Sequence, residues 1–361
     1  MHVRVLVLWA DTRSANLGVQ VLAHGMAALI RQAWGEDVVV DFQDYGTGDS
    51  EIGFGERNIL ADLGRRDGVL KRKLRQYDLI VDSGAGDSFT DIYGLRRLAW
   101  MYNAHRLSAG LGVPVALGPQ TVGPFNTRLG RAMGRSMLQN AAQVHVRDGV
   151  SATYAEDELN VVPDAKSTDV VFALPQPTSG QHHDVLLNVS GLLWQPNNHV
   201  DSARYRSLIF GLISGLKRQG RTVTLLSHVI ENPRPDNDAP VSRELGDELG
   251  LNIVIPKSLE HARAAVGSAQ LVIGSRMHAC LNALSTGTPS IPLAYSRKFA
   301  PLMADIGWPH VFDLRRDEEL IEPLLETVVS MQRTDNDEVD VLRARARARL
   351  ETSVEALKRL R

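Results

Sequence analysis

The stretch LVIGSRMHACLNALSTGTPSIPLAY, residues 271–295, decides the fold. Its apolar start predicts a strand that ends near Gly274, and a helix follows as far as Gly287, a residue type that commonly ends helices. A second strand is predicted from Ser290 onward. Strand, helix and strand in this order form the βαβ unit from which parallel sheets are built.

The same alternation of strands and helices extends outward from this stretch. It begins with the apolar strand 3–9, pauses at the segment 174–183, which holds two prolines and small polar residues, and restarts with the strand 184–191. Such a segment is typical of an interdomain linker, and 361 residues exceed what one core usually organises. We therefore predict an α/β protein of two Rossmann-like domains, GT-B-like, with the active site in the interdomain crevice.

This interpretation divides the chain into three parts. Residues 1–175 form the N-terminal Rossmann-like domain, residues 176–316 the C-terminal one, and residues 317–361 closing helices. In the closing part, four arginines alternate with alanines over residues 343–349, so on a helix they spread over more than one face. A solvated helix is the simpler interpretation, and weak contact with an anionic membrane surface is the alternative.

Composition narrows the class of protein. The chain has 40 basic and 42 acidic residues, so its net charge gives no reason to expect a nucleic-acid partner. Cys280 is the only cysteine, which excludes an intramolecular disulfide and favours the cytoplasm. No apolar run approaches the roughly 18 residues that a membrane span needs. We expect a cytoplasmic protein with at most peripheral contact at the inner face of the membrane.

Ligands of open parallel sheets bind at the carboxyl ends of the strands. In the second half, the polar residues at these ends are Asn188, Ser190, His228, Arg276, His278, Tyr295 and Lys298. These residues offer amide, hydroxyl, imidazole, guanidinium and ammonium groups to one ligand site.

The start of the helix after Gly274 is the best candidate for an anion site. Ser275 is placed to cap this helix, with Arg276 and His278 in its first turn. Helix N-termini attract anions, and a guanidinium binds phosphate or carboxylate through two hydrogen bonds. His278 would gain a proton more easily once a phosphate binds, which suits a proton donor. Cys280 points away from His278 around the helix, so we expect it to pack in the core.

These residues carry a resemblance to a known family. Residues 275–279, 287–289 and 295–298 closely resemble the C-terminal signature of the polysaccharide pyruvyl transferases. Weaker similarities cover most of residues 10–310 and include Asn16, Gly18, Gly84 to Gly86, Gly118 to Pro124, Arg147, Asp148, Ser151 and Asp169. The resemblance implies a GT-B-like fold.

The family's activity, as the resemblance implies it, is ketal formation. The carboxyethylidene group of phosphoenolpyruvate is moved onto two hydroxyls of a sugar in a glycan or glycan precursor, with release of phosphate. Arg276 and Arg147 would hold the phosphate and carboxylate of phosphoenolpyruvate, and His278 would transfer protons. The N-terminal domain would take the acceptor, and the C-terminal domain phosphoenolpyruvate. Lys298 is an added candidate for the anion pocket, and neither a metal nor a cofactor beyond this co-substrate is expected.

Several further residues are candidates for substrate binding. Gly84 and Gly86 could shape a backbone nest or simply a tight turn. Gln120, with the neighbouring Thr121, could bind sugar hydroxyls, and Asp87 could act as a base or cap a helix.

The chain departs from the family in its first loop. Many members carry Gly-Asp-Glu there, whereas Gly18 is followed here by Val19 and Gln20. Two other functions remain open at this point. A GT-B glycosyltransferase would use Arg276 and Lys298 for the diphosphate of a nucleotide sugar, and a non-enzymatic protein would only bind sugars or anions.

Overall fold

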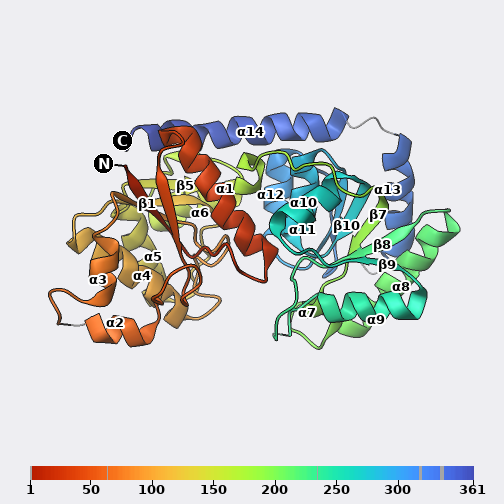
Figure 1. Cartoon of the computed structure of the whole chain (residues 1–361), viewed down its shortest axis with the longest axis horizontal. Helices are drawn as coiled ribbons and strands as arrows, with labels where there is room; N and C mark the ends of the chain where they lie inside the picture. The colour runs from red at the N-terminus through yellow and green to blue at the C-terminus, as the bar shows by residue number, and fades with distance from the viewer. Residues whose placement is uncertain (1, 63, 234, 317–318, 334–336) are drawn as a thin grey trace. The chain divides into compact units, whose positions relative to one another are not determined.

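The computed structural model describes residues 2–62, 64–233, 235–316, 319–333 and 337–361. The chain forms two compact units (Figure 1). The N-terminal unit comprises Met1–Ser14, Val19–Leu174 and Ala346–Arg361, and the C-terminal unit comprises Ala15–Gly18 and Pro175–Arg345. Each unit contains a parallel sheet flanked by helices, as the alternating sequence pattern predicts.

The sheet of the N-terminal unit has the strand order β2-β1-β3-β4-β5-β6. Its strands are β1 (Arg4–Leu8), β2 (Val39–Gln43), β3 (Leu79–Asp82), β4 (Val115–Gln120), β5 (Gln143–Val146) and β6 (Ala165–Lys166), all paired in parallel. Successive strands are added on opposite sides of β1, so the order reverses between β1 and β3. Such a switch point opens a ligand crevice at the carboxyl ends of the strands.

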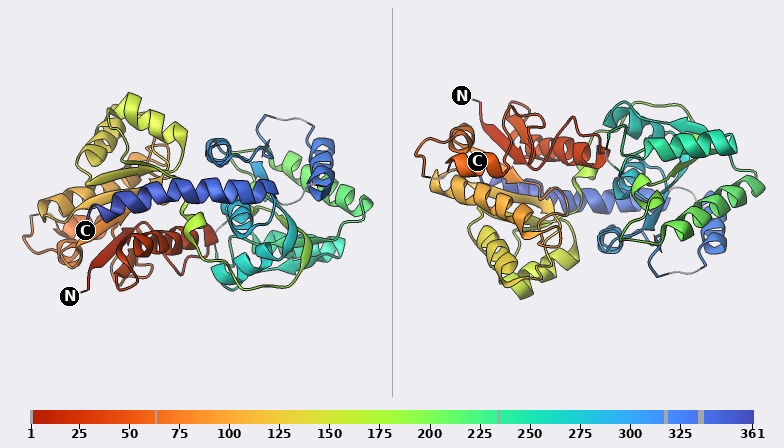
Figure 2. Two further views of the ribbon diagram at one scale, coloured as in Figure 1. Left: turned by 90° about the horizontal axis from the view of Figure 1, so that it is seen from above. Right: turned by 90° about the horizontal axis from the view of Figure 1, so that it is seen from below.

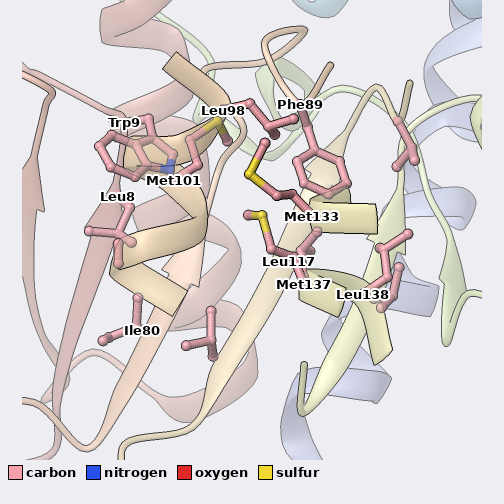
Figure 3. Close-up of a cluster of buried hydrophobic side chains, with 14 of the residues drawn as sticks. Leu8, Trp9, Ile80, Phe89, Leu98, Met101, Leu117, Met133, Met137 and Leu138 are labelled. Carbon is pink, nitrogen blue, oxygen red and sulfur yellow. The ribbon is translucent and has the colours of Figure 1, made fainter. Parts of the chain in front are cut away.

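Helices cover this sheet and close its core. They are α1 (Leu17–Trp34), α2 (Glu56–Asp62), α3 (Val69–Leu74), α4 (Leu95–Gly110), α5 (Arg128–Gln139), α6 (Gly149–Leu159), the 3₁₀ turn Val170–Ala173 and the end of α14 (Asp337–Lys358). Leu98 and Met101 of α4 and Met133 and Met137 of α5 pack on one face of the strands (Figure 3). Phe89 extends this apolar cluster toward the loop that follows β3.

The sheet of the C-terminal unit has the order β12-β11-β10-β7-β8-β9. Its strands are β7 (His183–Asn188), β8 (Val223–Leu226), β9 (Asn252–Val254), β10 (Ala269–Gly274), β11 (Ser290–Ala294) and β12 (Phe312–Asp313). Its helices are α7 (Gly191–Trp194), α8 (Ser202–Arg218), α9 (Ala239–Leu249), α10 (Leu259–Gly267), α11 (Met277–Thr286), α12 (Phe299–Ile306) and α13 (Ile321–Arg333). Here the order reverses between β7 and β10, so their carboxyl ends flank the switch point.

Two segments belong to a different unit from the residues that adjoin them in the sequence. The first loop belongs to the C-terminal unit, because Asn16 forms an antiparallel bridge with Val229 and Leu17 N–H donates to the carbonyl of His228 (3.2 Å). The last helical turns belong to the N-terminal unit (Figure 2). There Trp34 Nε1 donates to the carbonyl of Leu357 at 2.8 Å.

The arginines of the tail make specific contacts. Arg343 pairs with Asp340 at 2.9 Å, and Arg349 Nε donates to the carbonyl of Ser167 at 2.8 Å. Contact with a membrane surface stays a prediction. Among the described residues, the structure contains no helix with the length and apolar character needed to cross a membrane.

Candidate active site

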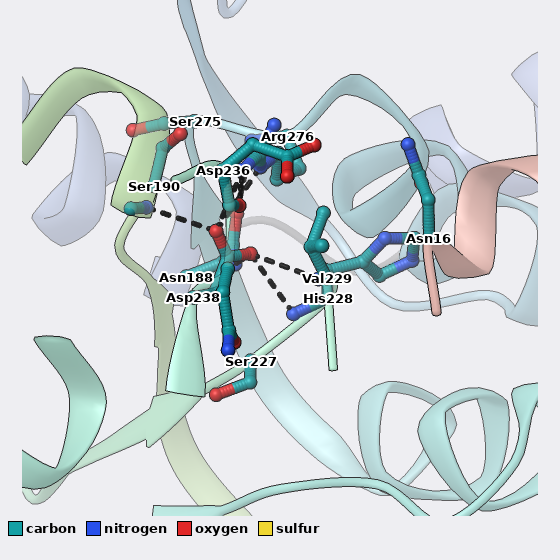
Figure 4. Close-up of polar contacts among 12 residues, drawn as sticks. Asn16, Asn188, Ser190, Ser227, His228, Val229, Asp236, Asp238, Ser275 and Arg276 are labelled. Atoms are coloured by element: carbon teal, nitrogen blue, oxygen red, sulfur yellow. Dashed lines mark hydrogen bonds and ion pairs between the residues drawn. The ribbon is translucent and has the colours of Figure 1, made fainter. Parts of the chain in front are cut away.

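Asp238 organises the switch point of the C-terminal sheet. This fully buried carboxylate precedes α9 and accepts hydrogen bonds from the backbone N–H groups of Gly191 (2.9 Å), His228 (3.1 Å) and Val229 (3.0 Å) (Figure 4). The side chain of Asn188 donates to it at 3.3 Å. A single carboxylate therefore ties the end of β7 to the segment that follows β8.

Arg276 completes this cluster through its side chain and its backbone. Its Nη2 and Nε donate to Asp238 at 2.8 and 3.2 Å, and Nη2 also donates to the carbonyl of Asp236. Its backbone N–H donates to Asn188 Oδ1 at 2.9 Å. Burial alone would lower the pKa of Arg276, but the attraction of Asp238 raises it above its ordinary value. The guanidinium is thus a permanent cation, held in one position and charge-paired.

The start of α11 differs in one detail from the sequence prediction. Arg276, and not Ser275, occupies the N-cap position, and among the described residues no side chain caps the helix. The Ser275 hydroxyl is hydrogen-bonded to the Tyr205 hydroxyl instead (2.8 Å), and the Tyr205 oxygen also accepts from Ser190 N–H (2.9 Å). Gly287 ends the helix with φ 97°, as predicted.

His278 lies in the first turn of α11, against the first loop of the chain. A Cβ atom on Gly18 would stand 2.8 Å from His278 Nδ1, so only glycine leaves the imidazole its present place. The N–H of Gly18 donates to Asn16 Oδ1 at 3.0 Å, which fixes the loop beneath the ring. The glycine of the altered first loop therefore keeps a role, namely to admit the His278 ring.

His228, after β8, is a second imidazole of this cluster and is 1% exposed. Burial, together with the nearby charges of His278 and Arg276, holds the pKa of His228 well below its ordinary value. Ser190 is likewise buried, and its hydroxyl has no hydrogen-bond partner among the described residues. The structure thus brings together four predicted residues: His228, Ser190, Arg276 and His278.

Tyr295 and Lys298 lie at the end of β11 and the start of α12. The Tyr295 ring meets the His199 ring edge-on, with 5.2 Å between centroids. Burial and the positive charges of Lys298 and Arg276 lower the pKa of His199. Sequence reasoning missed His199, because the polar loop that carries it shows no recognisable motif.

Arg147 lies in the N-terminal unit, at the end of β5, and is 1% exposed. Its Nε donates to Thr121 Oγ1 at 2.9 Å, and its Nη1 pairs with Asp169 at 3.1 Å. The third nitrogen, Nη2, is buried and has no hydrogen-bond partner among the described residues. A buried N–H without a partner is costly, so a ligand oxygen would be well accommodated there.

The Gly-rich loop after β3 lies against the same arginine. Residues 84, 85 and 86 all have positive φ, with 57° at Gly84 and 80° at Gly86. A Cβ on Gly84 would overlap Gln120 Oε1, and one on Gly86 would stand 3.4 Å from Arg147 Nη1. Gln120 is buried, and its Oε1 has no partner in the part of the chain that the structure describes. Four residues predicted from the sequence thus lie together at the carboxyl ends of β3, β4 and β5: Gly84, Gly86, Gln120 and Arg147.

Asp87 does not cap a helix. The next helix, α4, begins eight residues later with Gly94 at its N-cap, and Asp87 accepts a hydrogen bond from the Tyr93 hydroxyl at 2.9 Å. Cys280 packs in the core as predicted: it is fully buried, and burial raises the pKa of its thiol to about 12. Within the described ranges, no group of three or more His, Cys, Asp or Glu residues is placed to hold a metal ion.

Sequence reasoning also missed Asp238, although a signal was present. Asp238 precedes a helix that carries Pro240 in its first turn, which is the pattern of an N-cap residue. Its side chain does not cap α9. It reaches the strand ends instead, and a contact across 38 residues of sequence leaves no local pattern.

Solved structures resemble the whole chain in fold. HepE from Anabaena, solved in complex with UDP-glucose, aligns with a TM-score of 0.59 and 11% identity over 99% of this chain and 98% of that one. The UDP-GlcNAc 2-epimerase from Methanocaldococcus jannaschii aligns with a TM-score of 0.56 and 10% identity, covering 92% and 94%. At such identities the likeness shows the fold alone, two Rossmann-like domains of the GT-B type.

Sequence comparison is more specific. The amylovoran biosynthesis protein AmsJ from Erwinia amylovora is 24% identical over 264 residues, which are 66% of this chain and 62% of the length of AmsJ. A model of the polysaccharide pyruvyl transferases matches residues 16–297, from the first loop to the basic residues after β11. The chain belongs to the polysaccharide pyruvyl transferase family.

Proposed function

We propose that this enzyme transfers the carboxyethylidene group of phosphoenolpyruvate to two hydroxyls of a sugar in a glycan or glycan precursor. The products are a cyclic pyruvate ketal and phosphate. Family membership supports a transferase of polysaccharide biosynthesis, and the residues at the strand ends supply groups that suit this donor. Phosphoenolpyruvate serves as co-substrate, with no other cofactor.

The observation that carries the proposal is the start of α11. A guanidinium locked by Asp238, an uncapped helix N-terminus and an imidazole in the first turn meet at the switch point of the sheet. Uncapped N–H groups and the helix dipole favour an anion there. Arg276, with Lys298 and Tyr295, would bind the phosphate or carboxylate, while His278 lies next to the group that must be protonated.

The chemistry balances with one acid–base residue. His278 gives a proton to the methylene carbon of phosphoenolpyruvate, and a sugar hydroxyl attacks the cationic carbon that results. The bond from this carbon to the phosphate oxygen then breaks, and the second hydroxyl closes the ring. Of the two hydroxyl protons, one returns to His278 and the other leaves with phosphate. A positioned acid–base group typically contributes about 10²–10⁴-fold to such steps.

The N-terminal unit would hold the acceptor and one anionic group. Arg147 Nη2 is suited to donate to a carboxylate or phosphate oxygen, and Gln120 Oε1 to accept from a sugar hydroxyl. Gly84 and Gly86 let the backbone approach closely, and Asp87 borders the same loop. In the C-terminal unit, Ser190 and His228 are further donors to substrate oxygens. We place the reaction in the cytoplasm, at the inner face of the membrane where glycan intermediates are assembled.

The direct test is phosphate release from phosphoenolpyruvate with a panel of sugar acceptors. We expect acceptor-dependent release by the wild type and a loss of about 10²–10⁴-fold in His278→Gln. Gly18→Ala crowds the His278 ring and is expected to lower kcat, whereas Gly46→Ala, where an added Cβ meets no atom within 4 Å, serves as the matched control. Absence of release with every acceptor, combined with thermal stabilisation by UDP, would replace this proposal by a nucleotide-sugar activity.

A further inference from the structure

Among the described residues, Arg263 of α10 is a buried cation without an acidic partner. It is 4% exposed, and its Nη1 donates to Asn282 Oδ1 (2.9 Å) and Ser285 Oγ (3.0 Å), while Nη2 donates to the carbonyl of Pro175 (3.0 Å). Burial lowers the pKa of Arg263 to about 10, so it remains protonated at neutral pH. An uncompensated buried charge is costly, and such costs are concentrated at functional sites.

The position of Arg263 fixes the orientation of the Asn282 amide. A guanidinium only donates, so the Asn282 atom facing it must be the carbonyl oxygen. The amide NH₂ of Asn282 then faces His228 Nε2 at 3.1 Å. Because this NH₂ donates, His228 Nε2 accepts and carries no proton. The single proton of the neutral His228 ring therefore resides on Nδ1.

The hydrogen bonds from Arg263 to Asn282 and from Asn282 to His228 also make the Nδ1–H group of His228 a stronger donor. The charge of Arg263 polarises the Asn282 amide, which in turn withdraws electron density from His228 through Nε2. Hydrogen bonds in such a series reinforce one another, most of all at low dielectric. Arg276 is paired with Asp238, whereas Arg263 has no carboxylate partner among the described residues and reaches His228 through the Asn282 amide.

We propose that Arg263 and Asn282 are positioning residues that hold His228 as the neutral Nδ1–H tautomer, a fixed hydrogen-bond donor to an anionic oxygen of the substrate. This inference rests on the proposed function for the identity of the substrate, phosphoenolpyruvate. It divides the work between the two imidazoles of the cluster: His228 donates without titrating, and His278 moves the proton.

The tautomer can be measured without any turnover. The ¹⁵N shifts of histidine-labelled protein distinguish Nδ1–H from Nε2–H rings, and the signals of His228 are assigned by their loss in His228→Gln. We expect Nδ1–H in the wild type. Asn282→Asp places a carboxylate opposite Nε2, so we expect the proton to move to Nε2 or the ring to become doubly protonated. Ser285→Ala removes the other side-chain acceptor of Arg263 and the hydrogen bond from Ser285 Oγ to the Asn282 carbonyl, but leaves the Asn282 amide in place, so it should keep the wild-type signals.

Kinetics separate positioning from a structural role. We expect Asn282→Asp and Arg263→Met to raise the KM for phosphoenolpyruvate at least tenfold with a smaller change in kcat, and Arg263→Lys to restore part of the loss. A wild-type His228 that carries its proton on Nε2 would overturn the proposal, and so would an unchanged KM in Asn282→Asp with a shifted tautomer. If the wild type releases no phosphate with any acceptor, the proposed function fails, while the tautomer measurement still decides the positioning role.

Discussion

Two buried arginine–aspartate pairs, one in each unit of the described chain, differ in the other groups that their side chains contact. In the C-terminal unit, Asp238 binds Arg276 and also three backbone N–H groups, so the carboxylate holds strand ends together. In the N-terminal unit, Asp169 binds Arg147 and, among its other contacts, the backbone N–H of Val171, and the arginine keeps a buried nitrogen without a partner in the described residues. In the first pair the carboxylate has an architectural task in addition to holding its arginine, whereas in the second pair the arginine has a buried donor nitrogen without a partner among the described residues.

Paired substitutions test this difference and have the largest expected effect. Asp238→Asn and Asp169→Asn each leave a buried guanidinium uncompensated, so we expect each to lower the free energy of unfolding by about 3–5 kcal/mol. Asp169→Asn/Arg147→Met should recover to within about 1 kcal/mol of the wild type, because the amide still accepts from Val171. Asp238→Asn/Arg276→Met should remain destabilised by about 1–3 kcal/mol, since the new NH₂ faces at least one backbone N–H.

Urea unfolding measures these differences. Glu231→Gln is the control, because its ion pair with Arg243 at 2.6 Å lies in solvent and should not contribute measurably. Equal recovery in the two double variants would remove the distinction between the pairs. Activity adds a second readout: Asp169→Asn/Arg147→Met is expected to be stable and inactive.

Acid should lower the free energy of unfolding of both units, because each contains a buried neutral histidine. We expect this effect to be smaller than that of the aspartate substitutions. Burial lowers the pKa of His145 in the N-terminal unit to about 4. Between about pH 6.5 and 4 the unfolded chain therefore binds a proton that the folded chain does not, and stability falls as pH falls. At about 1.4 kcal/mol per pH unit, His145 alone accounts for about 3 kcal/mol by pH 4.

Urea unfolding at a series of pH values checks this expectation. The stability of His145→Gln should depend less on pH in this range than that of the wild type. The pKa of His228 in the C-terminal unit is also lowered. The stability of His145→Gln/His228→Gln should therefore depend on pH even less than that of His145→Gln. An unchanged slope in His145→Gln would show that its ring is protonated in the folded protein.

The sequence predicts those features of the site that depend on local order. Arg276 and His278 could be placed because a strand, a helix and a terminating glycine follow one another within 25 residues. The Ser275 cap was wrong because its hydroxyl is bound by Tyr205, which lies 70 residues away. Hydrogen bonds of this kind depend on which helices pack together, and the sequence pattern of a single segment does not predict that packing.

The same limit explains the residues that were missed. Asn282 has the pattern of an ordinary helix residue, and Arg263 that of a surface cation, until the packing of α10 against α11 brings them together at 2.9 Å. Gln120 is the opposite case. Its place at the end of β4 predicts a ligand contact, and the structure adds that its Oε1 is buried without a partner among the described residues.

Substituting Gln120 has the smallest expected effect on stability and separates ligand binding from folding. Gln120→Met removes this oxygen, and with it only a long hydrogen bond from Nε2 to the Asp82 carbonyl (3.5 Å), at nearly constant volume, so the free energy of unfolding should stay unchanged or rise by up to about 1 kcal/mol. Gln143→Met is the matched control on the neighbouring strand, because Gln143 Nε2 donates to the carbonyl of Ala356 (2.6 Å) and its Oε1 contacts His145 (3.1 Å). Losing these bonds should cost about 1–3 kcal/mol.

The two glutamines should therefore rank in opposite order for stability and for substrate binding. Gln120→Met is expected to raise the KM for the sugar acceptor while the protein unfolds at the same or a higher urea concentration. Gln143→Met should unfold earlier and keep its acceptor KM. If Gln120→Met is destabilised as much as Gln143→Met, its Oε1 is satisfied within the protein. The unsatisfied groups of the N-terminal unit would then no longer mark a ligand site, and the contrast between the two arginine–aspartate pairs would rest on Arg147 alone.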